Sequence, residues 1–120
     1  MDILIYHNPR CSKSRQTLQL LREHGVEPRI VEYLKQPPSA ARLKHLLGLL
    51  DMSPRDLMRR RERAYKELGL DNPALSDDEL IQAMTDNPAL IERPIVVKDD
   101  QQAVLGRPPE NVLALLREAP

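Results

Sequence analysis

The sequence has few of the residues on which several common functions depend. It contains one cysteine and three tyrosines, and it contains neither tryptophan nor phenylalanine. The single cysteine, Cys11, excludes an internal disulfide, so we expect a cytoplasmic protein that gains nothing from an oxidising compartment. With so few aromatic rings the core must be aliphatic, and a stacking platform for nucleic acid is hard to build. No long apolar run is present, so we expect neither secretion nor a membrane partner.

An excess of charge of one sign is also missing. Eighteen Lys and Arg residues balance eighteen Asp and Glu residues, which argues against a general polyanion binder. The balance hides a basic part, with fourteen cations and seven carboxylates in residues 1–66, and an acidic part, with four and eleven in residues 67–120. Thirteen of the eighteen cations are arginine. The length predicts a single domain over residues 1–120, and we expect a monomer.

The hydrophobic pattern of the first third predicts a β-loop-α-β unit. An apolar run over residues 3–6, followed by a turn sequence, is typical of a buried strand. Leucines recur at helical spacing over residues 12–24, and Gly25 stands where a helix C-cap is expected. Residues 30–34 are rich in β-formers and predict a second strand, parallel to the first.

Residues 39–88 have helical periodicity and predict a helical insertion, in which Ser76 begins a capping box. Residues 95–98 and 102–106 then predict a β-hairpin, and a closing helix is expected through residues 112–116. The order βαβ, helices, ββα predicts an α/β fold. It consists of a small four-stranded mixed sheet with the helical insertion between strands two and three.

Cys11 falls between the first strand and the first helix, so its sulfur is expected at a helix N-terminus. Unpaired backbone N–H groups and the helix dipole stabilise a thiolate there, as would the nearby cations His7, Arg10, Lys13 and Arg15. A lone cysteine can also be a small buried hydrophobic residue. The flanking segments are polar and turn-like, so we predict a reactive thiolate.

The same helix N-terminus is a candidate anion site. Ser12 and Ser14 add hydroxyl donors to the backbone N–H groups, so a thiolate and a bound oxyanion would share one site. A thiol that attacks an anionic substrate needs further positive charge from elsewhere in the chain. The many arginines supply candidates.

The sequence around the cysteine is Tyr6-His7-Asn8-Pro9-Arg10-Cys11-Ser12-Lys13-Ser14-Arg15. Further segments follow it in the chain: Tyr33-Leu34, Leu57-Met58-Arg59, residues 65–70, residues 93–97 and Gly106-Arg107-Pro108. Together they resemble the glutaredoxin-coupled arsenate reductases of the thioredoxin-like superfamily, a family that includes close uncharacterised relatives. The resemblance covers nearly the whole chain and implies a thioredoxin-like fold.

The resemblance also implies an oxidoreductase activity and a substrate site. In that family the cysteine matching Cys11 attacks arsenate, and the arginines matching Arg59, Arg93 and Arg107 hold the oxyanion. The peptide bond before Pro94 is expected to be cis, although X-Pro bonds in general favour trans. Arg59 can equally belong to a solvated charge run over residues 59–63, and Arg107 can be a turn residue.

Two further positions have roles by resemblance. The histidine matching His7 helps to lower the thiol pKa, although His7 can also simply pack against the sheet, and the serine matching Ser14 supports the thiolate. Glutathione is then the co-substrate that forms a mixed adduct, and glutaredoxin resolves it. No bound cofactor is implied, and no residue set completes a metal site. The absence of a second cysteine fits an external reductant.

Two other functions stay open at this point. One is a non-catalytic regulator of the same fold that binds RNA polymerase through the run at residues 59–63. Such regulators often carry a CxxC motif, whereas Ser14 stands at the fourth position here. The other is a monothiol oxidoreductase that acts on glutathionylated substrates through Cys11.

Overall fold

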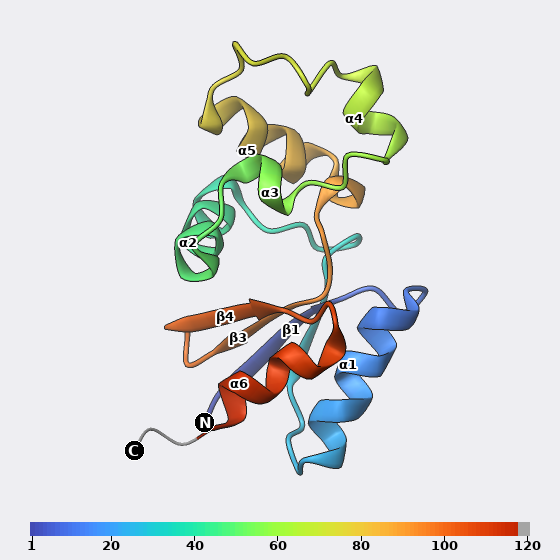
Figure 1. The fold of residues 1–120 in the computed structure, drawn as a ribbon, viewed down its shortest axis with the longest axis vertical. Helices are drawn as coiled ribbons and strands as arrows, with labels where there is room; N and C mark the ends of the chain where they lie inside the picture. The colour runs from blue at the N-terminus through green and yellow to red at the C-terminus, as the bar shows by residue number, and fades with distance from the viewer. Residues whose placement is uncertain (118–120) are drawn as a thin grey trace. The chain divides into compact units, whose positions relative to one another are not determined.

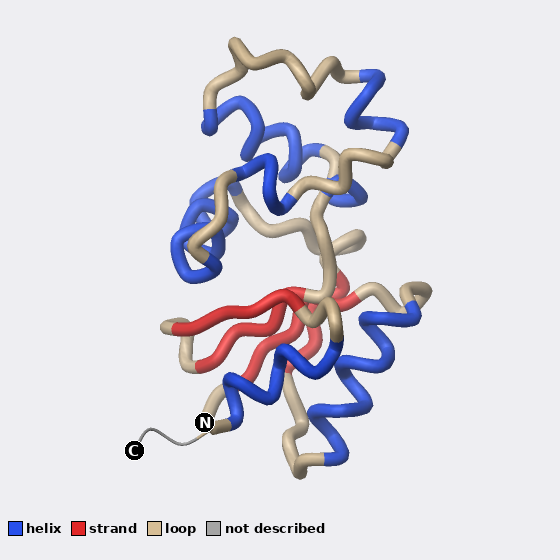
Figure 2. Tube along the Cα trace, in the orientation of Figure 1, coloured by secondary structure: helices blue, strands red, loops and turns tan. Residues whose placement is uncertain are grey.

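The computed structural model describes residues 1–117. The chain divides into two compact units (Figures 1 and 2). The sheet unit consists of Met1–Gln36 and the segment that begins at Arg93, and the helical unit is Pro37–Glu92. The residues expected to form the helical insertion lie within the second unit. That residues 1–120 act as one domain stays a prediction.

The sheet unit contains a mixed sheet of four strands in the order β2-β1-β3-β4 (Figure 2). The strands are β1 (Ile3–His7), β2 (Arg29–Glu32), β3 (Ile95–Lys98) and β4 (Gln102–Leu105). β1 pairs with β2 in parallel, and the β1–β3 and β3–β4 pairs are antiparallel. The predicted four-stranded mixed sheet, with the helical insertion between the second and third strands, is therefore confirmed.

The second strand is shorter than the sequence predicts. It ends at Glu32, because the backbone N–H groups of Lys35 and Gln36 both donate to the Glu32 carbonyl and turn the chain. The expected extension through Leu34 is therefore wrong. His7 pairs in register with Glu32, so the last residues of both parallel strands lie at one edge of the sheet.

Helix α1 (Ser12–Glu23) covers one face of this sheet (Figure 1). Its buried residues Ser14, Thr17, Leu18 and Leu21 have helical spacing and form one stripe. The chain closes with a 3-10 turn, η2 (Pro109–Val112), and a short helix, α6 (Leu113–Leu116), on the same face. The core between helices and sheet consists of Ile3, Ile5, Leu18, Leu21, Val96, Val112 and Leu115.

The helical unit contains four α-helices and one 3-10 turn within the described residues. They are α2 (Ala40–Leu50), α3 (Pro54–Leu57), α4 (Arg63–Glu67), α5 (Asp77–Asp86) and η1 (Pro88–Leu90). The predicted capping box of α5 is present, since the Ser76 hydroxyl accepts from the Glu79 amide and the Glu79 carboxylate accepts from the Ser76 amide. Leu43, Leu46, Leu57, Leu80, Met84 and Leu90 are at most 1% exposed and form the centre of this unit.

Two kinds of feature are not found in residues 1–117. No helix there has both the length and the apolar composition needed to cross a bilayer. No three His, Cys, Asp or Glu side chains of this part gather in the way that ligands of a metal ion do.

Candidate functional site

Cys11 is the N-cap residue of α1. Its backbone is extended, with φ −94° and ψ 122°, and its carbonyl accepts from the Arg15 amide at 3.0 Å, which begins the helix. Its own amide donates to the Asn8 carbonyl at 3.0 Å, so the loop before the helix is a closed turn. The side chain is 8% exposed. The cysteine thus lies where the first amides of a helix have no partner within the helix.

The surroundings of Cys11 favour the ionised sulfur. Burial acts to raise the pKa of the thiol and is the largest single influence. Hydrogen bonds from the Ser14 amide, the Arg93 side chain and the Lys13 amide, with the positive charge of Arg93, outweigh burial and lower the pKa below its ordinary value. This is the direction that the sequence predicts for a reactive thiolate at a helix N-terminus.

Two of the predicted arginines lie at the cysteine. The Arg107 Nη1 atom is 3.9 Å from the Cys11 sulfur, and Arg93 contributes both a hydrogen bond and charge to the same sulfur. Each arginine precedes a cis-proline, Pro94 or Pro108. The cis bond before Pro94 confirms the prediction, and the one before Pro108 has no counterpart in the sequence analysis.

Gly106 fixes the segment that carries Arg107. Its amide donates to the Pro94 carbonyl at 2.9 Å, and its carbonyl accepts from the Thr17 hydroxyl of α1 at 3.2 Å. A Cβ atom at this position would lie 2.5 Å from Thr17 Oγ1 and 2.8 Å from Pro94 Cγ, so only glycine fits. In the sequence, Gly106 stood out only as part of a segment that resembles the family, and nothing singled out Thr17. The signal for Thr17 was its place three residues after Ser14, on the buried stripe of α1.

His7 and Ser14 form a buried pair beneath the loop. His7 continues the face of β1 that presents Ile3 and Ile5 to α1, and Ser14 lies on the buried stripe of that helix. The His7 Nδ1 and Ser14 Oγ atoms are therefore only 2.6 Å apart and share a hydrogen bond. The Ser14 hydroxyl also accepts from the Asn8 amide at 3.1 Å. The pair ties the last residue of β1, the loop and the first turn of α1 together.

The burial of His7 acts against the expected role as a cation beside the thiol, and its part in stabilising the thiolate stays a prediction. Burial lowers the pKa of His7 below its ordinary value, and the positive charges of Arg22 and Arg15 lower it further, against an opposing influence of Glu32. These influences favour the neutral ring over the charged one. Its contribution to the site is to hold Ser14, whose amide in turn faces the sulfur.

The three predicted cations next to Cys11 in the sequence make different contacts. The Arg15 guanidinium donates to the Pro9 carbonyl at 2.9 Å and braces the loop. Lys13 is exposed and influences the sulfur through its amide. Arg10 is also exposed, and its amide donates to the Asn8 side chain at 3.0 Å.

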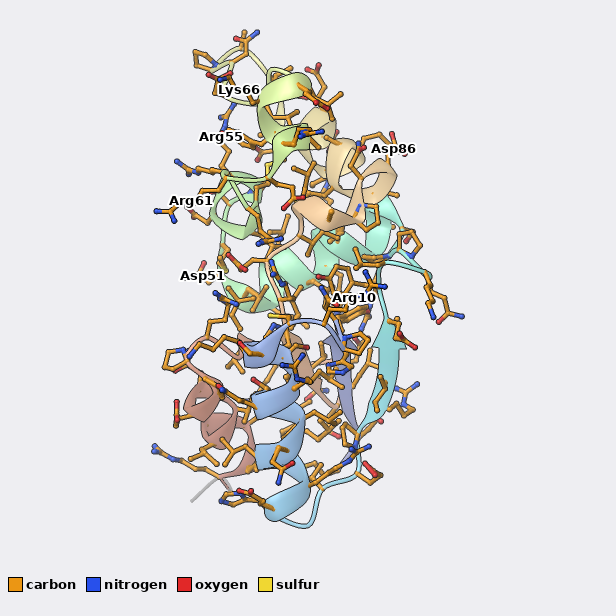
Figure 3. All side chains as sticks on the ribbon, turned by 90° about the vertical axis from the view of Figure 1, so that its right-hand side faces the viewer. Arg10, Asp51, Arg55, Arg61, Lys66 and Asp86 are labelled. Atoms are coloured by element: carbon orange, nitrogen blue, oxygen red, sulfur yellow. The ribbon has the colours of Figure 1, made fainter. Side chains whose placement is uncertain are left out.

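Arg59 belongs to the helical unit. Its amide donates to the Leu90 carbonyl at 2.7 Å, and its guanidinium pairs with Glu62 at 2.9 Å and approaches Glu92 at 4.0 Å. Its side chain is 33% exposed. The next arginines are exposed, and Figure 3 shows Arg61 extending away from the ribbon. A part for Arg59 in oxyanion binding stays a prediction.

Residues 59–63 fall in the segment with helical periodicity, but most of this charge run is not helical. Only its last residue, Arg63, is helical, because α4 begins there. Arg59 is the arginine of this run that the resemblance matches to the family. It directly follows Met58, which forms an isolated antiparallel β-bridge with Ile91.

Comparison with known proteins gives consistent matches over nearly the whole chain. The model of the ArsC family matches residues 6–115. Over 116 residues the chain is 58% identical to the uncharacterized protein YfgD of Escherichia coli K12, covering 96% of this chain and 97% of that protein. It is 51% identical to an arsenate reductase of Neisseria meningitidis serogroup A, covering 96% and 98%.

Among solved structures, the arsenate reductase from Vibrio cholerae superposes with a TM-score of 0.92 at 51% sequence identity. The match covers 95% of this chain and 97% of that one. The likeness therefore extends over nearly the whole length of both chains.

Proposed function

The chain belongs to the ArsC family, and from this we propose that it reduces arsenate to arsenite with Cys11 as the nucleophile. The observation that carries the proposal is the environment of the Cys11 sulfur. A thiol with a lowered pKa lies at the first amides of a helix, with Arg93 and Arg107 beside it. Such a site pairs a nucleophile with donors for an oxyanion.

In the first step the Cys11 thiolate attacks arsenic. A sulfur–arsenic bond forms, and one arsenate oxygen takes up protons and leaves as water. The planar guanidinium groups of Arg93 and Arg107 hold the remaining oxygens and neutralise their charge, as arginine does with phosphate. We assign the third arginine, Arg59, to the same oxyanion.

The electrons come from outside the chain. Reduction of arsenate to arsenite needs two electrons, which two thiols supply when they form a disulfide, with one oxygen lost as water. Cys11 is the only cysteine, so it cannot form that disulfide within the chain. We propose glutathione as the co-substrate and glutaredoxin as the thiol that resolves the adduct, in a reducing cytoplasm where thiols persist.

The test follows arsenite formation from arsenate with glutathione and glutaredoxin present. The wild-type protein should produce arsenite, and Cys11→Ser should produce none. Arg93→Lys and Arg107→Lys should each lower kcat/KM by about tenfold or more, because a point charge does not replace a planar fork. Arg63→Lys is the matched control, because Arg63 is an exposed arginine near Glu67 and should leave the rate unchanged.

A wild-type protein without arsenite production overturns the proposal. If it then accumulates a stable Cys11–glutathione adduct, the monothiol oxidoreductase function takes its place.

A further inference from the structure

The side chain of Asn111 bridges the end of β4 and the residue Arg107. Its Nδ2 atom donates to the Leu105 carbonyl at 3.1 Å and to the Arg107 carbonyl at 3.2 Å. Leu105 is the last residue of β4, and Arg107 follows it by two positions. One side chain therefore holds the carbonyl groups on either side of Gly106.

The turn η2 fixes Asn111 itself. The Asn111 backbone amide donates to the Pro108 carbonyl at 3.0 Å, and Pro109 and Val112 of the same turn are buried. Val112 belongs to the core between the sheet and its helices. Asn111 is exposed, but its side chain extends from a backbone that this core holds in place.

The two hydrogen bonds require a particular kind of side chain at this position. Two carbonyl oxygens face one atom, so that atom must supply two hydrogens. The carboxamide nitrogen of asparagine has two N–H donors, whereas a hydroxyl group has one and a carboxylate has none. The contacts of Asn111 add to those of Gly106, whose amide donates to Pro94 and whose carbonyl accepts from Thr17.

We propose that Asn111 is a positioning residue for Arg107, and this rests on the oxyanion role proposed above for Arg107. The Arg107 Nη1 atom lies 3.9 Å from the Cys11 sulfur, at the end of a long side chain that starts from the bridged main chain. Arg107 is exposed, so burial in the core does not hold it. A displacement of about 1 Å in a residue of a reactive site can cost much of its effect, so the hydrogen bonds that support such a residue matter to function.

The test compares two reagents that alkylate Cys11 in the full-length protein, without arsenate and without glutathione. Iodoacetate is an anion and iodoacetamide is neutral, and both react with the thiolate. Measured at one pH, the ratio of their second-order rate constants is independent of the thiolate fraction. The ratio therefore reports the positive charge beside the sulfur.

Arg107→Gln should lower the iodoacetate to iodoacetamide ratio by about two- to fivefold, the range for partly exposed charge pairs. Asn111→Ala should lower it by about twofold, because the guanidinium is still present but no longer held at the sulfur. Asn111→Ser, which keeps one donor, should give an intermediate ratio. In protein that already carries Arg107→Gln, Asn111→Ala should have no further effect, since the charge that it positions is gone.

Asn87→Ala is the matched control. The Asn87 Nδ2 atom also donates to a main-chain carbonyl, that of Ala83 at 3.1 Å, but this bond lies at the end of α5 in the helical unit. Its loss should leave the alkylation ratio unchanged. The control thus separates the positioning of Arg107 from the general cost of an asparagine hydrogen bond.

An Asn111→Ala ratio equal to that of wild type overturns the proposal, even if arsenate reduction is established. An equal fall with and without Arg107→Gln also overturns it, because Asn111 would then act through another group. So does an Arg107→Gln ratio equal to that of wild type, since no charge at the sulfur would remain to be positioned.

The proposed reaction fails separately from this role. If the wild-type protein reduces arsenate, Asn111→Ala should also lower kcat/KM for arsenate by about twofold or more. A wild-type protein that produces no arsenite loses the proposed reaction, whereas the alkylation ratios still decide whether Asn111 holds Arg107 at the sulfur.

Discussion

The Thr17 hydroxyl donates to the Gly106 carbonyl at 3.2 Å and so joins α1 to the segment that carries Arg107. The same hydroxyl also donates to the Lys13 carbonyl at 2.8 Å within the helix. Thr17 is fully buried, so water cannot easily replace its hydroxyl as the donor to the Lys13 and Gly106 carbonyls. The contact joins the residue before Arg107 to α1, one helical turn after Ser14.

Thr17→Val tests what this hydroxyl contributes to stability. The substitution keeps the shape and removes the hydroxyl, so it should lower the free energy of unfolding by about 1–3 kcal/mol. Urea denaturation measures the loss. Thr85→Val is the control, because the Thr85 hydroxyl is buried without a hydrogen-bond partner among residues 1–117, and its removal should be neutral or stabilising. Equal losses in the two variants would contradict a stabilising role for the hydrogen bonds of the Thr17 hydroxyl.

Gly106→Ala should be destabilising for a different reason. The added Cβ would lie 2.5 Å from Thr17 Oγ1 and 2.8 Å from Pro94 Cγ, and relief of this overlap must shift the segment before Arg107. We expect a loss of about 1–3 kcal/mol in thermal or urea unfolding. Gly48→Ala is the matched control, since Gly48 lies in α2 with no atom within 4 Å of a Cβ, and it should stabilise by about 1 kcal/mol.

The thiol should ionise below the ordinary cysteine pKa of about 8.5. The rate of alkylation by iodoacetamide, measured against pH, reports the thiolate fraction. Arg93→Gln should move the midpoint to higher pH, because Arg93 supplies a hydrogen bond and charge to the sulfur. Arg63→Gln, which removes an exposed arginine of the helical unit, should leave the midpoint in place. A wild-type midpoint at or above the ordinary value contradicts the proposed thiolate.

His7 should titrate below its ordinary pKa of about 6.5, because burial disfavours the charged ring. From about pH 6.5 downward, the unfolded chain then binds a proton at His7 more readily than the folded chain, so stability falls as pH is lowered towards the folded pKa. NMR titration of the His7 ring measures the shift. His7→Gln should show a smaller loss of unfolding free energy between about pH 7 and pH 5 than wild type. A ring that titrates above the ordinary value would restore the cationic role.

The sequence predicted those elements whose signals are local. The strand at residues 3–6, the leucine spacing of α1 and the Ser76 capping box each depend on neighbours within one or two turns, and all three are present. The end of β2 was predicted wrongly. Tyr33 and Leu34 have strand propensity, but two hydrogen bonds to the Glu32 carbonyl turn the chain there.

The candidate site was predictable where chemistry depends on residue type, and less so where it depends on burial. Cys11 at a helix N-terminus followed from its position between a strand and a helix. The lowered pKa of His7 could not follow, because it arises from burial on the face of β1 that α1 covers. Gly106 packs against Thr17 and Pro94. Thr17 and Gly106 are almost ninety positions apart, so no local sequence pattern predicts this contact.

The sheet unit draws its site from both ends of the chain, with Cys11 and Ser14 near the start and Arg93 and Arg107 near the finish. During synthesis on a ribosome, the cysteine is therefore made long before its guanidinium neighbours. Until residue 93 has emerged, Cys11 lacks the guanidinium that donates to its sulfur and helps to lower its pKa. A chain interrupted within the helical unit would carry the nucleophile without the two arginines that lie beside it.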